Sequence, residues 1–151
     1  MDIASHLFSM DWRLEMRKCE VNGDFFIDGK GILRERAVYS DSQEQTKDTF
    51  SFKWKQKGSY CGERMNAKYR EWLREKYFAN DMDMLEKIFH NGSVALDAGC
   101  GAGMSAIGLL GEKLKDIYYI GVDISSAIEE AQENMEAMGC GQNSEFVQCD
   151  L

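Results

Sequence analysis

The sequence predicts an α/β fold in which a parallel sheet follows a mostly helical leader. Three apolar runs alternate with two segments of helical periodicity, at 93–98, 104–115, 117–123, 126–138 and 144–150. This alternation is typical of βαβ units, whose crossover helices make neighbouring strands parallel. Before residue 91, aromatic and charged residues mix without such a pattern. We therefore expect a leader over 1–90 and a sheet domain over 91–151.

The leader is expected to contain a hairpin followed by helices. In VNGDFFIDGKGILR, glycine and aspartate separate short apolar pieces, which indicates turns between strands. RMNAKYREWLREKYF places Met65, Tyr69 and Trp72 on one stripe of a helix, with charges opposite. DMDMLEKIFH predicts a short helix whose N-cap is Asn80 or Asp81.

The sheet domain is expected to begin with the strand SVALDA. The continuous apolar run IYYIGVD suits a second strand that is buried on both faces, and SEFVQCD is the third strand. Ser126 and Glu129 have the spacing of a capping box for the second helix, and Gly139 suits its end. The helical periodicity predicts that the two helices bury Ile107, Leu110, Leu114, Ile128, Ala131, Met135 and Met138.

Three strands and two crossover helices make half of a doubly wound sheet. In such sheets the first strand lies centrally, yet SVALDA has a candidate partner on one side alone. An apolar strand with an unpaired edge favours association with other chains. The pattern therefore predicts that this chain is the N-terminal part of a longer protein, with self-association through the open edge as another outcome.

The composition is that of a globular domain, with 44% hydrophobic and 29% charged residues among 151. No apolar run reaches the roughly 20 residues of a membrane span, and the N-terminus lacks the pattern of a signal peptide. We therefore expect a cytosolic protein that does not enter membranes. Five cysteines without a CxxC pair indicate reduced, buried thiols and not a zinc site.

The net charge of −8 lies entirely in the second part of the chain. Residues 91–151 contain ten acidic residues against two basic ones, Lys113 and Lys115. Such a surface repels phosphate backbones, so we do not expect nucleic acid as a partner. Basic and aromatic residues do mix within 47–76, and we interpret them as an amphipathic cover whose lysines face water.

A glycine-rich turn, LDAGCGAG, follows the first strand and precedes a helix. Such a turn directs backbone N–H groups at a ligand and lets the ligand approach closely. Gly101, Gly103 and Ala106 match the G-x-G-x-x-G/A pattern of dinucleotide-binding proteins, and Asp123 lies near the spacing of their ribose-binding acid. Asp97 opposes a dinucleotide, because its carboxylate would repel the pyrophosphate.

Three segments resemble motifs of the class I S-adenosylmethionine-dependent methyltransferases. LDAGCGAG resembles the first motif, an acid followed by G-x-G-x-G, while YIGVDIS and FVQCDL resemble the second and third. The resemblance covers 93–151 and implies a Rossmann-like sheet, of which this chain holds the first half. It also implies S-adenosylmethionine as cofactor and methyl transfer to a small-molecule acceptor. Asp97 agrees with that cofactor, which carries an ammonium and a sulfonium group.

The resemblance also implies roles for single residues. Asp123 would accept hydrogen bonds from the ribose hydroxyls, Asp150 would bind the adenine amino group, and Ile124 would pack on the adenine face. The implied cofactor-binding residues are Asp97, Ala98, Gly99, Cys100, Gly101, Gly103, Asp123, Ile124, Asp150 and Leu151. Simpler roles stay open, since Asp97 could cap the turn, Asp123 could cap the next helix and Asp150 could be a solvated aspartate.

Part of the leader resembles that of some bacterial small-molecule methyltransferases, in which a short F-x-x-x-W element roofs the cofactor site. Phe50 and Trp54 have this spacing, whereas Cys19 stands alone where some such leaders carry a zinc ribbon. The family's general base, where one is used, generally lies beyond the third strand, so we name no catalytic residue and no metal ligand. A nicotinamide-dependent oxidoreductase and a non-catalytic, truncated binding or interaction module remain the alternatives.

Overall fold

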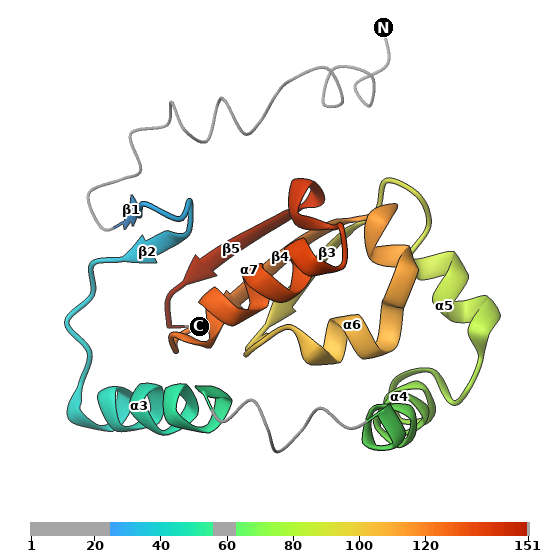
Figure 1. Ribbon diagram of the computed structural model, residues 1–151, viewed down its shortest axis with the longest axis horizontal. Helices are drawn as coiled ribbons and strands as arrows, with labels where there is room; N and C mark the ends of the chain where they lie inside the picture. The colour runs from blue at the N-terminus through green and yellow to red at the C-terminus, as the bar shows by residue number, and fades with distance from the viewer. Residues whose placement is uncertain (1–24, 56–62, 151) are drawn as a thin grey trace, which may run out of the picture.

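The computed structural model describes residues 25–55 and 63–150, leaving out the side chains at 53–55 and 63–66. These residues form a twisted sheet with helices packed against it (Figure 1). The strands are β1 Phe25–Ile27, β2 Leu33–Glu35, β3 Val94–Ala98, β4 Tyr118–Asp123 and β5 Ser144–Gln148. The helices are α3 Asp41–Lys55, α4 Glu63–Phe78, α5 Met82–Ile88, α6 Met104–Leu110 and α7 Ala127–Ala137. The predicted α/β class is confirmed.

The sheet has the strand order β1-β2-β5-β4-β3. The predicted hairpin is confirmed, because β1 and β2 pair antiparallel, and β3, β4 and β5 are parallel as expected. The sequence pattern did not predict that β2 would pair in parallel with β5, with Leu33 opposite Val147. The hairpin therefore extends the sheet beyond β5, and one sheet contains strands from both sides of residue 91.

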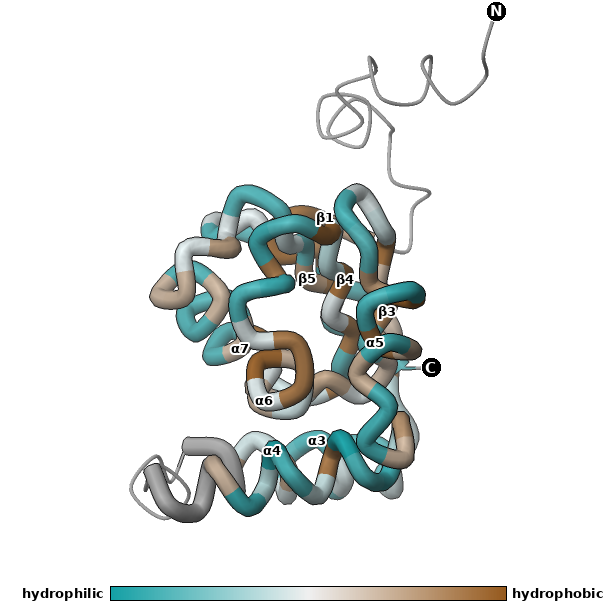
Figure 2. The backbone as a smooth tube through the Cα atoms, turned by 90° about the vertical axis from the view of Figure 1, so that its right-hand side faces the viewer, coloured by the Kyte–Doolittle hydropathy of each residue, from teal (hydrophilic) through white to brown (hydrophobic). Residues whose placement is uncertain are grey.

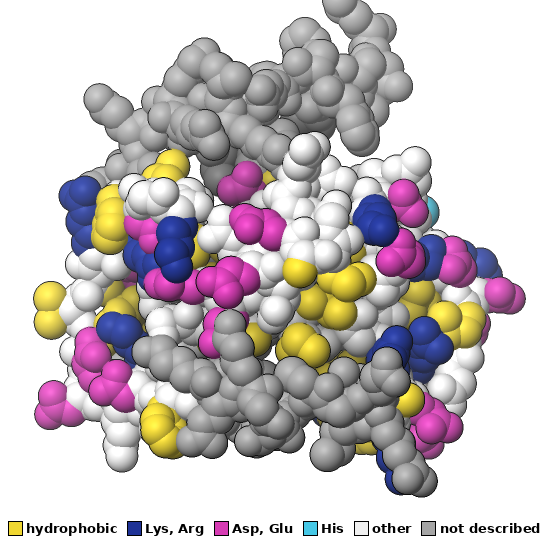
Figure 3. Space-filling view, viewed as in Figure 1, with side chains coloured by type: hydrophobic (Ala, Val, Ile, Leu, Met, Phe, Trp, Pro, Cys, Tyr) yellow, Lys and Arg dark blue, Asp and Glu magenta, His cyan; other side chains and the backbone are white. Residues whose placement is uncertain are grey.

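An ion-pair network fastens the hairpin to the rest of the sheet. The Arg34 guanidinium donates to Asp28 at 2.7 Å, to Glu129 of α7 at 2.8 Å and to Gln148 of β5. Lys30 adds a second ion pair with Glu129, at 2.7 Å. In Figure 3, basic and acidic side chains lie next to each other in the region where the hairpin meets α7.

Helices α6 and α7 cover one face of the sheet with a continuous apolar core. The fully buried side chains include Leu114, Ile117, Tyr119, Ile128 and Met135. Figure 2 shows that α6 is largely hydrophobic, whereas α3 and α4 are mostly hydrophilic. Among the described residues, no helix combines the length and the apolar character that crossing a membrane requires.

The opposite face of the sheet is less well covered near β3. The side chains of Val94 and Leu96 are 65% and 66% exposed. Tyr118 and Ile120 of β4 are only half-buried, so the prediction that this strand is buried on both faces was wrong. Among the described residues β3 pairs with β4 alone, which agrees with the predicted open edge.

Two local predictions differ from the structure, and a third is confirmed. The helix expected over 104–115 ends at Leu110, because Gly111 turns the chain at φ 54° and a 3₁₀ turn, Gly111–Lys115, follows. Tyr69 and Trp72 of the predicted stripe are 37% and 48% exposed, and the residue of α4 that is buried against Gly108 of α6 is Leu73. The N-cap of α5 is as predicted, with Asp81 accepting from the Met84 N–H at 2.9 Å.

The capping box predicted for α7 is absent from the described structure. Ser126 makes no side-chain capping bond, and Glu129 instead pairs with the hairpin cations. The neighbouring Ser125, which is fully buried, takes over the role: its hydroxyl accepts from the Ala127 N–H at 3.3 Å and donates to Asp123 at 2.6 Å. Gly139 ends the helix as expected, at φ 76°.

We predict that Ser125→Ala lowers the free energy of unfolding by about 1 kcal/mol, because the Ala127 N–H and the Asp123 carboxylate each lose a hydrogen bond. Ser126→Ala is the matched control, and a change under about 0.5 kcal/mol is expected there. Urea titration followed by circular dichroism measures both. Equal losses in the two variants would contradict the assignment of the cap to Ser125.

We also predict that Glu129→Gln destabilises the fold by about 1 kcal/mol at neutral pH, since it removes two ion pairs at the hairpin. The hydrogen bond from Lys30 lowers the pKa of Glu129 below 4.5, burial opposes this, and Arg34 lowers the pKa further. Because the folded-state pKa is depressed, the stabilisation is present above about pH 4.5 and is lost as the pH falls through the folded-state value.

The difference in unfolding free energy between wild type and Glu129→Gln should therefore shrink in acid. Glu130→Gln is the control on the same helix, because Glu130 forms no ion pair within the described part of the chain. A difference that persists at low pH would mean that the ion pairs are not its cause.

Candidate functional site

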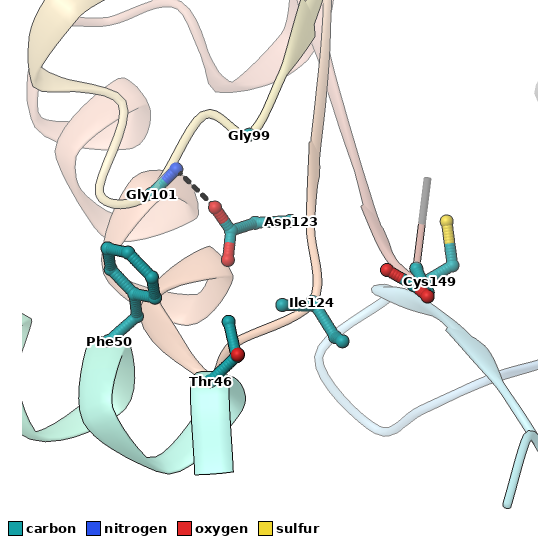
Figure 4. A pocket seen from close by; sticks show the side chains of 8 residues that line it. Thr46, Phe50, Gly99, Gly101, Asp123, Ile124 and Cys149 are labelled. Carbon is teal, nitrogen blue, oxygen red and sulfur yellow. Dashed lines mark hydrogen bonds between the residues drawn. The ribbon is translucent and has the colours of Figure 1, made fainter. Parts of the chain in front are cut away.

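A pocket lies at the carboxyl ends of the parallel strands, between the glycine turn after β3 and the helix α3 (Figure 4). Its volume is about 250 Å³. It is lined by Thr46, Phe50, Gly99, Gly101, Asp123, Ile124, Cys149 and Asp150. Ligands of open parallel sheets bind at such carboxyl ends, so this is the candidate site.

The glycine turn has a backbone that side chains rarely adopt. Gly99, Gly101 and Gly103 have φ values of 75°, 53° and 74°. A Cβ atom at Gly103 would also lie 3.5 Å from the Cβ of Ala131 in α7, whereas a Cβ at Gly99 would meet nothing within 4 Å. Gly103 thus permits close packing of turn and helix, and Gly99 leaves open space toward which a ligand can approach.

Asp123, at the end of β4, links the glycine turn to the turn before α7. Its Oδ2 accepts from the Gly101 N–H at 2.7 Å, which Figure 4 shows as a dashed line. Its Oδ1 accepts from the N–H of Ser125 at 2.8 Å and from the hydroxyl of Ser125 at 2.6 Å. A carboxylate offers about four acceptor positions. Three are used, so one position on Oδ2 remains for a ligand.

Helix α3 of the leader forms the wall opposite the strand ends. Phe50 and Thr46 extend from it toward Asp123 and Ile124 (Figure 4). Two hydrogen bonds attach α3 to the rest of the site: Ser51 Oγ accepts from the Ser126 N–H at 3.1 Å, and Gln43 donates to Asp150. The leader therefore supplies part of the site.

Asp97 does not line the pocket itself. Its Oδ2 accepts a hydrogen bond from the Tyr119 hydroxyl at 2.8 Å. Burial raises the pKa of Asp97, the Tyr119 hydrogen bond lowers it, the negative charge of Asp123 raises it, and the net shift is upward. Asp97 is thus a half-buried carboxyl beneath the glycine turn, close enough to Asp123 for their charges to interact.

The structure brings together some of the residues implied by the sequence motifs and not others. Gly99, Gly101, Asp123, Ile124 and Asp150 share the pocket. Ala98 is exposed at the end of β3, the Cys100 side chain is buried toward the core, and Gly103 packs on α7. Leu151 lies outside the described residues.

Four contributors were not assigned from the sequence motifs: Thr46, Cys149, Ser125 and Gln43. Phe50 is a fifth, because its F-x-x-x-W spacing was noted but no site residue was assigned from it. The Trp54 side chain is outside the described part. Cys149 adjoins the motif residue Asp150, and that adjacency is the one signal that could have indicated it.

The described cysteines, Cys100, Cys140 and Cys149, are free thiols. The first two are buried, as predicted, and Cys149 is only half-buried. Cys19 and Cys61 lie outside the described residues. Within residues 25–55 and 63–150, no group of three or more His, Cys, Asp or Glu side chains is placed to hold a metal ion.

Several solved structures are similar to this chain. One is a magnesium protoporphyrin IX methyltransferase from Synechocystis with bound S-adenosylhomocysteine, at 20% identity and a TM-score of 0.49, covering 73% of this chain and 52% of that one. Another is a geranyl diphosphate C-methyltransferase from Streptomyces coelicolor, at 12% identity and a TM-score of 0.45, covering 76% and 50%. This chain thus spans about half the length of either structure.

No curated protein sequence matches the chain. A family model described as a methyltransferase domain matches residues 89–151, the part that contains β3, β4, β5 and the glycine turn. The match therefore includes every strand end that lines the pocket. Residues 89–151 of this chain are thus similar to the methyltransferase-domain family.

Proposed function

We propose that this chain binds S-adenosylmethionine in the pocket and forms the cofactor-binding part of a methyltransferase that acts on a small molecule. The observation that carries the proposal is the position of Asp123, whose carboxylate bridges the glycine turn and keeps one acceptor position free beside the pocket. A ribose hydroxyl is a donor that such a position accepts. The family match over 89–151 supports the same function.

The remaining residues support a division of the site between the parts of the cofactor. Ile124, Cys149 and Phe50 provide apolar surface suited to an adenine ring, and Asp150 lies beside them as an acceptor for its amino group. The carboxyl of Asp97, beneath the turn, suits the ammonium group at the other end of the cofactor. Ala98, Cys100 and Gly103 would shape the turn, and the Leu151 backbone would approach the ring.

A nicotinamide dinucleotide is the alternative ligand. Its pyrophosphate would lie over the glycine turn, next to the carboxyl groups of Asp97 and Asp123. The repulsion disfavours the dinucleotide and favours a ligand that presents cations there. Any general base remains outside this proposal.

The location proposed for this reaction is the cytosol. The three described cysteines are free thiols, and reduced thiols are usual in that compartment. Expression with a fluorescent tag, followed by fractionation, would test the location.

We predict that S-adenosylhomocysteine binds the purified protein and that Asp123→Ala weakens this binding at least about tenfold, as expected for loss of a hydrogen bond to a charged group. Isothermal titration calorimetry measures the affinity, and NAD is the control ligand. Asp116→Ala is the control variant, because this exposed aspartate lies just before the opposite end of β4.

Thermal unfolding of each variant separates loss of binding from loss of folding. Binding of NAD in preference to S-adenosylhomocysteine would favour the oxidoreductase alternative. A folded protein that binds neither ligand would contradict the proposed cofactor site.

We also propose that the open edge of β3 allows two copies of this chain to associate. Antiparallel pairing of β3 with its copy would continue the sheet, and the exposed Val94 and Leu96 would gain apolar contacts. A non-catalytic interaction module would use the same edge.

The predicted outcome is a dimer in sedimentation velocity that Leu96→Lys converts to a monomer, because two lysines would face each other across the pair. Val38→Lys is the matched control, since Val38 is fully exposed outside the sheet. A monomeric wild type, or a dimer that survives Leu96→Lys, would contradict this association.

A further inference from the structure

A tyrosine of the core reaches the acid of the glycine motif. Tyr119 is 1% exposed, and its hydroxyl donates to Oδ2 of Asp97 at 2.8 Å. Among the described residues this hydroxyl is the one side-chain hydrogen-bond partner of Asp97, so Oδ1 has none. Oδ1 also keeps some exposure to solvent, since the fully buried side-chain atoms that lack a hydrogen bond do not include it. Asp97 therefore has one oxygen fixed by the core and one available to a ligand.

Glycine on the neighbouring strand makes this contact geometrically feasible. Asp97 and Gly121 are partners in the register of β3 and β4. A Cβ at Gly121 would lie 3.1 Å from Cε1 of Tyr119 and 3.1 Å from Sγ of Cys100. Because Gly121 has no side chain, the Tyr119 ring can lie beneath the turn and reach across to Asp97.

The Tyr119 ring is held in place from its other side. Its centroid lies 6.1 Å from that of Phe146 on β5, with the planes tilted by 57°. A buried ring between two strands and a turn has little rotational freedom, and a buried hydroxyl requires a partner. The hydroxyl is thus presented to Asp97 in a fixed position.

We propose that Tyr119 is a positioning residue, whose hydroxyl orients the Asp97 carboxylate so that its second oxygen accepts the ammonium group of bound S-adenosylmethionine. This inference rests on the proposed function. It extends that function from the glycine turn to the second strand, where the sequence motifs assign no role to a tyrosine.

The charges around Asp97 determine how the contact depends on pH. The groups that face it are the Tyr119 hydroxyl, the Cys100 thiol and the Asp123 carboxylate. Burial holds the pKa of Tyr119 above its ordinary value, so the hydroxyl stays protonated and donates. Its hydrogen bond lowers the pKa of Asp97 against burial, and removing the hydroxyl should raise that pKa further.

The test compares two ligands on the wild type and on Tyr119→Phe by calorimetry over a range of pH. S-adenosylhomocysteine carries the ammonium group, and 5′-methylthioadenosine lacks the amino-acid end. We expect Tyr119→Phe to weaken the binding of S-adenosylhomocysteine about fivefold to tenfold in mild acid and less in mild base. The variant raises the pKa of Asp97, so that more of its carboxyl is protonated and uncharged in mild acid. Binding of 5′-methylthioadenosine should stay unchanged.

Tyr118→Phe is the matched control, a tyrosine beside Tyr119 on the opposite face of β4. Asp97→Asn is the second variant and keeps the inference testable if Tyr119→Phe folds poorly. It should weaken S-adenosylhomocysteine, remove the pH dependence and spare 5′-methylthioadenosine. Retention of the pH dependence in Asp97→Asn would overturn the inference.

The remaining outcomes separate this inference from the proposed function. If the wild type binds S-adenosylhomocysteine and Tyr119→Phe shows the same affinity and pH profile, the role of Tyr119 is refuted while the cofactor site stands. If Tyr119→Phe weakens both ligands equally, the residue has a structural role only and the inference fails. If the folded wild type binds neither ligand, the proposed function and this inference are both refuted.

Discussion

The pocket depends on one carboxylate that joins two turns. Asp123 accepts from the Gly101 N–H on one side and from Ser125 on the other. These groups belong to successive βα units. A buried N–H without an acceptor is costly, so the bridge determines the shape of the glycine turn as well as its position. The residue that is proposed to bind ribose is thus also the one that organises the place where ribose would lie.

The leader belongs to the site as much as the sheet domain does. Arg34 of the hairpin donates to Gln148, and Gln148 in turn donates to the carbonyl of Ile124 at 3.0 Å. This chain of hydrogen bonds connects the hairpin to a residue that lines the pocket. Helix α3 reaches the same place from the other direction through Ser51 and Gln43. Both attachments thus hold segments that line the pocket.

Local features of the sequence predicted most of the strands and the glycine turn, because hydrophobic periodicity and glycine act over a few residues. The pairing of β2 with β5 could not be predicted in this way, since it joins residues more than a hundred positions apart. The cap of α7 was misplaced by one residue because both Ser125 and Ser126 fit a cap, and only burial beside Asp123 distinguishes them. The Asp97–Tyr119 bond likewise requires the strand register and the missing side chain of Gly121.

The parallel pairing of β2 with β5 has a consequence for how the chain acquires its structure. The hairpin leaves the ribosome before its pairing strand and its ion-pair partner Glu129, which are synthesised about a hundred residues later. A contact of such high sequence separation is slow to form, because a long loop must close first. Before that contact forms, the hairpin is an isolated two-stranded ribbon, which is marginally stable at best. Until the hairpin docks, the edge of β5 that it covers is open to mispairing.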